Sequence, residues 1–394
     1  MKTYDWVVVG AGIAGAAIAY ELARKGFAVL LLEQFLRPQN ATRYSYGGIS
    51  FWSGTTPLTH QLCNEGILRH RLLSEQLDAS TEFRELDLLM TIPAHIDPHA
   101  AAASYAHFAI PPTLLSVEEA CELEPLLNSQ VIAGALTVKH GHVHPDKTAQ
   151  AYIQAFVRAG GTMEMAEVLE LQTTQRTASE LRLTGVKTTT TTYPTANVIV
   201  CAGGLSRQLL KSSGICIRLY FTHAEMIETP QVDVQLRTLV MPANLKRFQL
   251  EAESTKIDEL WDEPSHELLP PILDAGAVQF QNGSLRLGQI SRVFTDPYLQ
   301  VDSVKSEQLL RKSVGEILPK LANLPGSWHH CLVAFSRDRL PLIGKILGWE
   351  GVNIFSGFSN ALAIIPPLAQ RFANLASGQR DDILPHLSPT RFNS

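Results

Sequence analysis

The feature that most constrains the fold is a glycine-rich turn near the amino terminus, Gly10-Ala11-Gly12-Ile13-Ala14-Gly15. It follows the apolar run Trp6-Val7-Val8-Val9, and a run rich in valine is typical of a strand buried on both faces. The alanine and leucine pattern from residue 16 to residue 23 has helical spacing. The glycines are therefore predicted to form the turn between a buried strand and a helix.

Each glycine has a physical role in such a turn. Gly10 makes the tight turn, Gly12 lets the backbone approach a pyrophosphate, and Gly15 lets the helix pack closely on the strand. The N–H groups at the start of the helix, at Ile13 and Ala14, then point towards the phosphates. We expect these five residues to bind a dinucleotide; an ordinary glycine turn is the alternative.

A second apolar run, residues 27 to 32, is predicted to be the next strand, and it ends in Glu33 and Gln34. Glu33 lies about 20 residues after the glycines, the usual distance for a carboxylate that binds ribose hydroxyls. Such a carboxylate would repel a 2′-phosphate. This pattern alone does not separate FAD from NAD.

Composition limits the other possibilities. The 394 residues are enough for two or three domains, and 33 basic against 38 acidic residues give a net charge of -5. No basic cluster is present to bind a phosphate backbone, so nucleic-acid binding is disfavoured. The five cysteines lack C-x-x-C spacing, which favours reduced intracellular thiols. With no run long enough to span a bilayer, we expect a cytoplasmic protein without a transmembrane segment; weak membrane association stays open.

The segment from residue 37 to residue 49 mixes turn formers, hydroxyls and a glycine pair and is predicted to be an irregular loop beside the nucleotide. Backbone N–H groups and an arginine here can bind a diphosphate or a flavin ring. A solvated connector is the alternative. The candidate binding residues are Arg43, Tyr44, Ser45, Gly47 and Gly48.

Three histidines at alternate positions, His140, His142 and His144, would face one side of a strand. A metal site is disfavoured, because nothing nearby completes a ligand set and the run ends in a turn at Pro145. We therefore predict no metal.

The strand–turn–helix pattern recurs twice. Residues 198–206 run from a buried strand into small residues and a helix, and residues 352–377 do the same through Gly357-Phe358-Ser359-Asn360. The block from residue 215 to residue 328 has longer strands and no nucleotide signal, so it should contact substrate, although residues 236–269 show no clear pattern. Further candidate cofactor-binding residues are Val168, Cys201, Ala202, Gly203, Gly357, Phe358, Ser359, Asn360 and Ala361.

Together, residues 10–33, 198–206 and 338–378 resemble, in the right order, the FAD-dependent D-amino-acid oxidase superfamily, in the branch of glycine oxidase, monomeric sarcosine oxidase and D-amino-acid dehydrogenases. The resemblance implies an α/β protein whose cofactor is FAD. It also implies a discontinuous Rossmann-like FAD-binding domain and a second, α+β substrate domain with a mixed or antiparallel sheet. The ranges are 1–85, 140–214 and 329–394 for the first domain, and 86–139 and 215–328 for the second.

The implied activity is FAD-dependent oxidation of the C–N bond of a small amine or amino acid. Hydride transfer to the flavin leaves an imine that is hydrolysed, and the electrons pass to oxygen, a quinone or another carrier. Two alternatives stay open: oxidation of a 2-hydroxy acid, and a flavin-binding protein without amine turnover. An NAD-only dehydrogenase is disfavoured, because the two later flavin-like segments would then have no purpose.

One departure from the family pattern concerns the substrate carboxylate. In glycine oxidases an arginine five residues before the aspartate of an Asp-x-x-Pro motif binds it, but here that position is Val333, before Asp338. Arg286 lies two residues before Gly288, where sarcosine oxidases have a lysine used in oxygen activation; a solvated strand residue is the alternative. The arginines nearby in sequence are Arg218, Arg286, Arg292, Arg337 and Arg339.

A second departure concerns attachment of the flavin. Cys331 lies where sarcosine oxidases attach the flavin through a thioether, although cysteine is also a common core residue. Beside it, His329 and His330 are possible bases, and on a strand they would point to opposite faces. His223 is a further candidate. The predicted catalytic residues are thus Arg286, His223 and His330.

Overall fold

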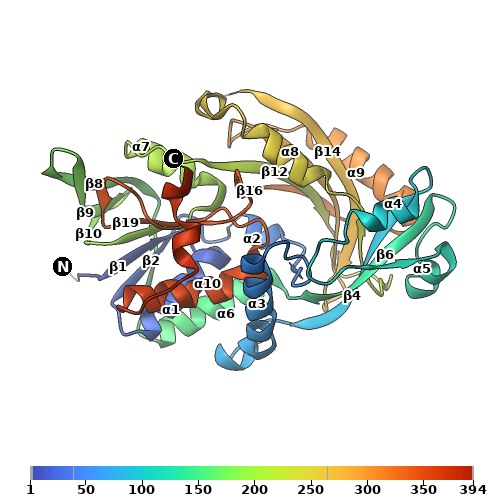
Figure 1. The fold of residues 1–394 in the computed structure, drawn as a ribbon, viewed down its shortest axis with the longest axis horizontal. Helices are drawn as coiled ribbons and strands as arrows, with labels where there is room; N and C mark the ends of the chain where they lie inside the picture. Colours follow the sequence, from blue (N-terminus) through green and yellow to red (C-terminus); the bar gives the residue numbers. More distant parts are fainter. Residues whose placement is uncertain (1–2, 39, 264, 393–394) are drawn as a thin grey trace.

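The computed structural model describes residues 3–38, 40–263 and 265–392. Residue 39 of the expected loop, and the outermost residues of the first and last domain ranges, lie outside the described part. The chain forms an α/β layer around one sheet and, beside it, a second layer around a larger sheet (Figure 1). This arrangement confirms the predicted α/β class.

The first sheet is six-stranded, with the order β17-β19-β11-β1-β2-β7. Its central strands are parallel, and β17 alone runs antiparallel to its neighbour. The apolar runs predicted to be strands thus lie side by side, so their carboxyl ends share one edge. The strands are β1 (Trp6–Val9), β2 (Val29–Glu33), β7 (Thr162–Met165), β11 (Val198–Val200), β17 (Leu342–Lys345) and β19 (Val352–Ser356).

Helices α1, α6 and α10 pack together against one face of this sheet, and α3 packs on α10 (Figure 1). Their bounds are α1 Ile13–Arg24, α3 Pro57–Gln76, α6 Pro145–Arg158 and α10 Ala361–Ala376. Small strands and α7 supply apolar residues to the core on the other face. These are β8 (Val168–Thr177), β9 (Glu180–Thr188), β10 (Thr192–Pro194), β18 (Trp349–Glu350) and α7 (Ser206–Ser212).

The second sheet is nine-stranded and mixed, which confirms the prediction for the second layer. Its order is β16-β12-β15-β14-β13-β4-β6-β3, with β5 paired to β6; only β13 and β4 are parallel. The strands are β3 (Gly48–Ile49), β4 (Arg84–Pro93), β5 (Thr113–Leu115), β6 (Ile132–His142), β12 (Leu219–Glu228), β13 (Leu239–Pro242), β14 (Glu267–Gln279), β15 (Leu285–Phe294) and β16 (Ser327–Ser336).

Short helices cover parts of the large sheet. Helix α9 (Ser303–Ile317) buries Leu310 and Val314 against it, and α8 (Lys246–Ser254) packs on β14 and β15. Residues 236–269 therefore contain a strand, a helix and the 3₁₀ turn η2 (Asp258–Asp262), and such short elements leave no sustained periodicity. The remaining α-helices are α2 (Ala41–Tyr44), α4 (Pro98–Ala103) and α5 (Val117–Leu123).

Strand β16 connects the two layers. It is an edge strand of the large sheet, paired with β12 along its whole length, and the chain then continues into β17 of the first sheet. The predicted border between residues 328 and 329 falls inside β16. The division into two discontinuous domains stays a prediction.

Gly66 lies where α3 crosses α10, and we expect Gly66→Ala to destabilise the protein. An added Cβ would lie 1.7 Å from the carbonyl oxygen of Ala363, which is backbone and cannot rotate away. Overpacking of this kind costs about 2 kcal/mol, more than the roughly 1 kcal/mol gained in helix propensity. Urea unfolding should show the loss, with Asn64→Ala, an exposed change on the same helix, as the control. An unchanged midpoint for Gly66→Ala would contradict this contact.

Candidate active site

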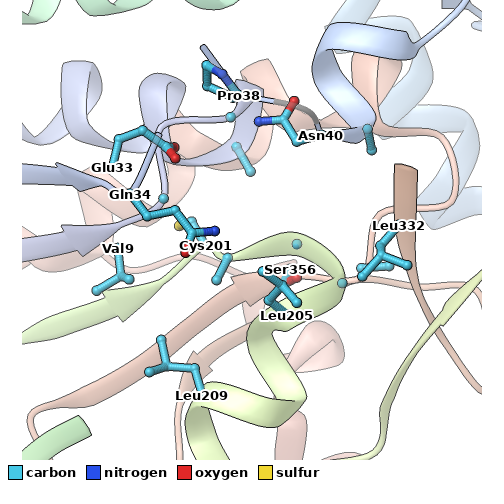
Figure 2. A pocket seen from close by; sticks show the side chains of 18 of the residues that line it. Val9, Glu33, Gln34, Pro38, Asn40, Cys201, Leu205, Leu209, Leu332 and Ser356 are labelled. Atoms are coloured by element: carbon cyan, nitrogen blue, oxygen red, sulfur yellow. The ribbon is translucent and has the colours of Figure 1, made fainter. Parts of the chain in front are cut away.

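A cleft of about 400 Å³ lies at the carboxyl edge of the six-stranded sheet (Figure 2). The glycine turn, the end of β2, the residues after β11 and the turn after β19 all line it, so three segments distant in sequence converge there. The candidate cofactor residues that line it are Gly10, Gly12, Ile13, Ala14, Glu33, Gln34, Val168, Cys201, Ala202, Gly203, Gly357, Phe358 and Ala361. Their role in binding stays a prediction.

The glycine turn is as tight as expected. Gly10 has a φ of +98°, and a Cβ there would lie 2.7 Å from the carbonyl oxygen of Cys201. A Cβ on Gly15 would lie 1.8 Å from the carbonyl oxygen of Gly10. Gly15 does not line the cleft; it lets α1 pack on the turn, so the helix N-terminus faces the open space.

Glu33 is buried at the end of β2 and lines the cleft (Figure 2). One of its oxygens accepts a hydrogen bond from the Ala11 N–H at 2.8 Å, and the other accepts one from the Phe35 N–H at 3.1 Å. Two carboxylate oxygens have about four acceptor positions, so acceptor capacity is left for ribose hydroxyls. The carboxylate is fixed in place before any ligand binds.

The loop after β2 contains two polar residues that the sequence did not single out. Asn40 caps the short helix α2 by accepting from the Arg43 N–H, and the Thr42 hydroxyl accepts from the Ile13 N–H at 3.0 Å. Both residues line the cleft. The expected irregular loop therefore contains a helical turn that brings Thr42 to the N-terminus of α1. An asparagine three residues before Arg43 was the available capping signal.

Eight further candidate cofactor residues do not line the cleft. Asn360 binds the loop at Ser50, through the Ser50 hydroxyl at 2.8 Å and its carbonyl at 3.2 Å. The Ser359 hydroxyl is buried and has no hydrogen-bond partner among the described residues, as a group that binds a ligand would. The candidate cofactor residues outside the lining are Arg43, Tyr44, Ser45, Gly47, Gly48, Cys331, Ser359 and Asn360.

The histidines of β6 lie under the glycine pair. The Trp52 indole N–H donates to His140 Nδ1 at 3.0 Å, and a Cβ on Gly48 would lie 2.6 Å from His140 Nε2. Burial lowers the pKa of His140 and of His142 to about 3, so both are neutral at pH 7. No group of three His, Cys, Asp or Glu side chains within the described ranges is arranged to hold a metal ion.

Arg286 is buried and belongs to an ion cluster with the partly buried Arg43 and Glu228. Both terminal nitrogens of Arg43 donate to Glu228 at 2.7 Å, and Arg286 donates to Glu228 at 3.3 Å and to the Ser45 carbonyl. Burial lowers the pKa of Arg286, and Glu228 opposes that shift. The terminal nitrogens of both arginines are thus already bound within the protein.

The histidine candidates lie on two faces of the large sheet. Ala224 pairs with Cys331 and Glu225 with His330, so Cys331 and His330 point to opposite sides. His330 stacks on His223, with ring centroids 5.8 Å apart. His329 lies on the Cys331 side and stacks on Tyr44 at 4.6 Å. Arg286 is therefore separated from His223 and His330, and the catalytic role of all three stays a prediction.

Cys331 is buried, and burial raises the pKa of its thiol to about 12 although Arg247 and Arg286 lower it. The thiol is therefore protonated at neutral pH. Attachment of the flavin through Cys331 stays a prediction.

This architecture, with a glycine cradle at the edge of a parallel sheet and a large mixed sheet beside it, is that of a two-layer flavoenzyme. Residues 5–375 match the family model described as FAD dependent oxidoreductase (DAO). The chain belongs to this family, which confirms the resemblance to the D-amino-acid oxidase superfamily.

Individual relatives agree in fold. The chain is 27% identical over 224 residues to monomeric sarcosine oxidase of Streptomyces avermitilis, which is 54% of this chain and 55% of that protein. It is 25% identical over 257 residues to glycine oxidase of Geobacillus kaustophilus, which is 61% of this chain and 65% of that protein. The crystal structure of that glycine oxidase superposes with a TM-score of 0.76, 20% identity and 99% coverage of both chains. The crystal structure of L-proline dehydrogenase from P. horikoshii superposes with a TM-score of 0.77 at 19% identity, covering 100% of this chain and 98% of that one.

The chain spans 55% and 65% of the length of these two curated relatives. Its family is described as FAD dependent oxidoreductase, and the residues at the cleft fit that cofactor. The glycine turn leaves room for the pyrophosphate, and Glu33 has acceptor capacity for ribose. The buried Ser359 hydroxyl, next to the lining residue Phe358, has no hydrogen-bond partner among the residues that the structure describes. No helix in the described part of the chain is long and apolar enough to cross a membrane.

We expect Gly12→Val to abolish most FAD retention. A Cβ at this position would lie 3.2 Å from the Thr42 hydroxyl, and the valine methyl groups would extend into the space for the pyrophosphate. Overpacking of 1–3 kcal/mol corresponds to a loss of affinity of about tenfold or more. The ratio of flavin absorbance to protein absorbance after desalting measures retention. Lys25→Val, at the exposed end of the same helix, is the control. Full retention in Gly12→Val would contradict this placement.

We expect acid to destabilise the fold through His140, the buried histidine against which Gly48 packs. The folded pKa of His140 is about 3 and the unfolded value is near 6.5, so its contribution is complete above pH 6.5. As the pH falls from 6.5 towards 3, the unfolded chain binds the proton and stability declines by about 1.4 kcal/mol per pH unit. Urea unfolding at pH 7 and pH 5.5 should show a smaller loss for His140→Gln than for wild type. His99→Gln, a change at an exposed histidine, is the control. An equal loss of unfolding free energy between pH 7 and pH 5.5 in wild type, His140→Gln and His99→Gln would refute this assignment.

Proposed function

We propose that this enzyme oxidises the C–N bond of a small amine or amino acid. The observation that carries the proposal is the course of the cleft, which runs from the glycine turn to Leu332, Val333 and Ala334 of β16. Val333 lies on the same face of the large sheet as Cys331 and His329, and Glu228 of β12 lies on that face as well. A flavin reaching this position would have the substrate between its ring and the sheet.

The names of related proteins support this substrate class. The sarcosine oxidase and the glycine oxidase are named for small amines or amino acids, as are the structural neighbours L-proline dehydrogenase and iminodiacetate oxidase. Each of the compounds in these names has a C–H bond next to an amine nitrogen.

FAD, when bound, supplies a two-electron acceptor, and the protein binds and orients the reactants. Ala224 and Met226 are buried on the Cys331 side of the sheet and Val333 is partly buried there, so apolar side chains cover this side. Glu228 is neutralised by Arg43 and Arg286, so it does not hold the substrate nitrogen in its protonated form.

His329 is the candidate proton acceptor in this proposal. Burial lowers its pKa, which keeps the ring neutral near pH 7, and its Nδ1 is 3.0 Å from the Tyr44 hydroxyl. A neutral imidazole on this face is suited to receive the amine proton before the C–H bond breaks.

A 2-hydroxy acid, which has a hydroxyl in place of the amine and keeps the carboxylate, is the second candidate substrate. Because the arginine of glycine oxidases is absent at Val333, the amino-acid pattern is incomplete on β16. The electron acceptor that we propose is oxygen, a quinone or another carrier, and the proposed compartment is the cytoplasm.

We expect a small amine or amino acid to bleach the flavin under anaerobic conditions. Glycine, sarcosine, proline, D-amino acids and 2-hydroxy acids should be added in turn to the oxygen-free holoenzyme while the flavin absorbance is followed. Bleaching by an amine supports the proposal, because two electrons have then left the substrate for FAD. Dithionite gives the fully reduced reference.

The same panel can contradict the proposal. Bleaching only by hydroxy acids would replace amine oxidation with alcohol oxidation. Bleaching by dithionite but by no panel member would remove the small-amine assignment. Acid precipitation of the same sample tests Cys331, since a thioether keeps the flavin with the protein pellet.

A further inference from the structure

Arg247 of α8 is connected to the strand neighbour of Val333 through two hydrogen bonds. Thr222 is the cross-strand partner of Val333, and directly paired side chains lie about 5 Å apart on the same face. The Thr222 hydroxyl donates to Glu251 at 3.1 Å, and Glu251 accepts from Nε of Arg247 at 3.0 Å. Two contacts therefore connect the strand neighbour of Val333 to Arg247.

The attachment of Arg247 leaves its ligand-binding edge unoccupied. Only Nε bonds to Glu251, and among the described residues neither terminal nitrogen has a hydrogen-bond partner. The side chain is 28% exposed while Glu251 is 2% exposed, so a buried carboxylate holds an arginine that is itself only partly buried. The two terminal N–H groups of an arginine match the two oxygens of a carboxylate.

Arg247 also lies close to the face where substrate is proposed to bind. Burial raises the pKa of the Cys331 thiol, and the positive charge of Arg247 is close enough to lower it in part. The acidic groups that face Arg247 are Glu251 and Asp274, and Asp274 accepts from Asn244 at 3.1 Å. Glu251 is bound at the Nε side, so it does not occupy the terminal edge.

The other arginines considered are engaged or differently placed. Arg43 and Arg286 bind Glu228, and Arg292 binds Glu225 at 2.6 Å on the His330 face. Arg218 is exposed and donates to the Phe392 carbonyl. Arg337 is exposed, and Arg339, which is also exposed, stacks on Phe248. Arg247 alone combines a buried anchor with an open terminal edge close to Val333.

We propose that Arg247 binds the carboxylate of an amino-acid substrate, in place of the arginine that is missing at position 333. Glu251 and Thr222 are the positioning residues that hold its guanidinium. This inference rests on the proposed function and narrows the substrate to amines that carry a carboxylate. It places the anion contact on a helix rather than on β16.

Acetate tests the carboxylate contact without turnover. Acetate is added to the FAD-loaded enzyme, and its apparent Kd is read from the shift in the flavin absorbance spectrum. We expect Arg247→Met to weaken acetate binding roughly 100-fold, since loss of a close charged partner has effects of this size. Arg247→Lys keeps the charge but loses the pair of terminal N–H groups, so its acetate Kd should lie between those of wild type and Arg247→Met. Arg218→Met removes an exposed arginine and should behave as wild type.

The positioning role of Glu251 has its own readout. Glu251→Gln keeps an acceptor for Thr222 but removes the charge that holds Arg247, so we expect acetate binding to weaken about tenfold. With a carboxylate-bearing substrate from the bleaching panel, Arg247→Met should raise KM far more than it lowers kcat. With an amine that lacks the carboxylate, it should leave KM unchanged.

Two results would overturn the inference. One is an acetate Kd in Arg247→Met equal to that of wild type at equal FAD content; the other is a wild-type flavin spectrum that acetate does not change. Neither result depends on turnover, so they are distinct from failure of the amine panel. If no amine bleaches the flavin but acetate binding depends on Arg247, the carboxylate contact stands and the amine chemistry falls.

Discussion

The structure depends on the contact between Gly15 and the carbonyl of Gly10. A Cβ at position 15 would lie 1.8 Å from that oxygen, so α1 can sit on the turn only because no side chain intervenes. This contact aims the helix N-terminus at the cleft. It also brings the Ala11 N–H to the Glu33 carboxylate, which orients the group predicted to bind the ribose. The nucleotide half of the site is thus fixed by backbone geometry more than by charged side chains.

The sequence was sufficient for this half because its signals are local. Strands β1, β11 and β19 each combine an apolar run with small residues at the carboxyl end, and a parallel sheet brings such ends to one edge. Thr42 was missed because its role depends on Asn40 starting α2, a single helical turn inside an expected loop. Propensity is a weak guide for an element of four residues.

The substrate half was less predictable because its contacts join distant segments. Arg43 and Glu228 are 185 residues apart, and nothing local to either residue indicates that they pair. Pleating alone predicts that His329 and His330 diverge, but not that His330 stacks on His223 across β12 and β16. Arg247 lies in the stretch without clear periodicity, where α8 owes its position to packing on β14 and β15.

The charges of the substrate half follow one rule, that burial favours neutral or paired groups. It lowers the pKa of His329, raises that of the Cys331 thiol, and leaves Glu228 matched by two arginines. Two arginines against one carboxylate leave this face with one net positive charge, but the terminal nitrogens of both arginines are already bound within the protein. Its selectivity must then come from a group whose pairing is incomplete, and Arg247, bound to Glu251 through Nε only, meets that condition.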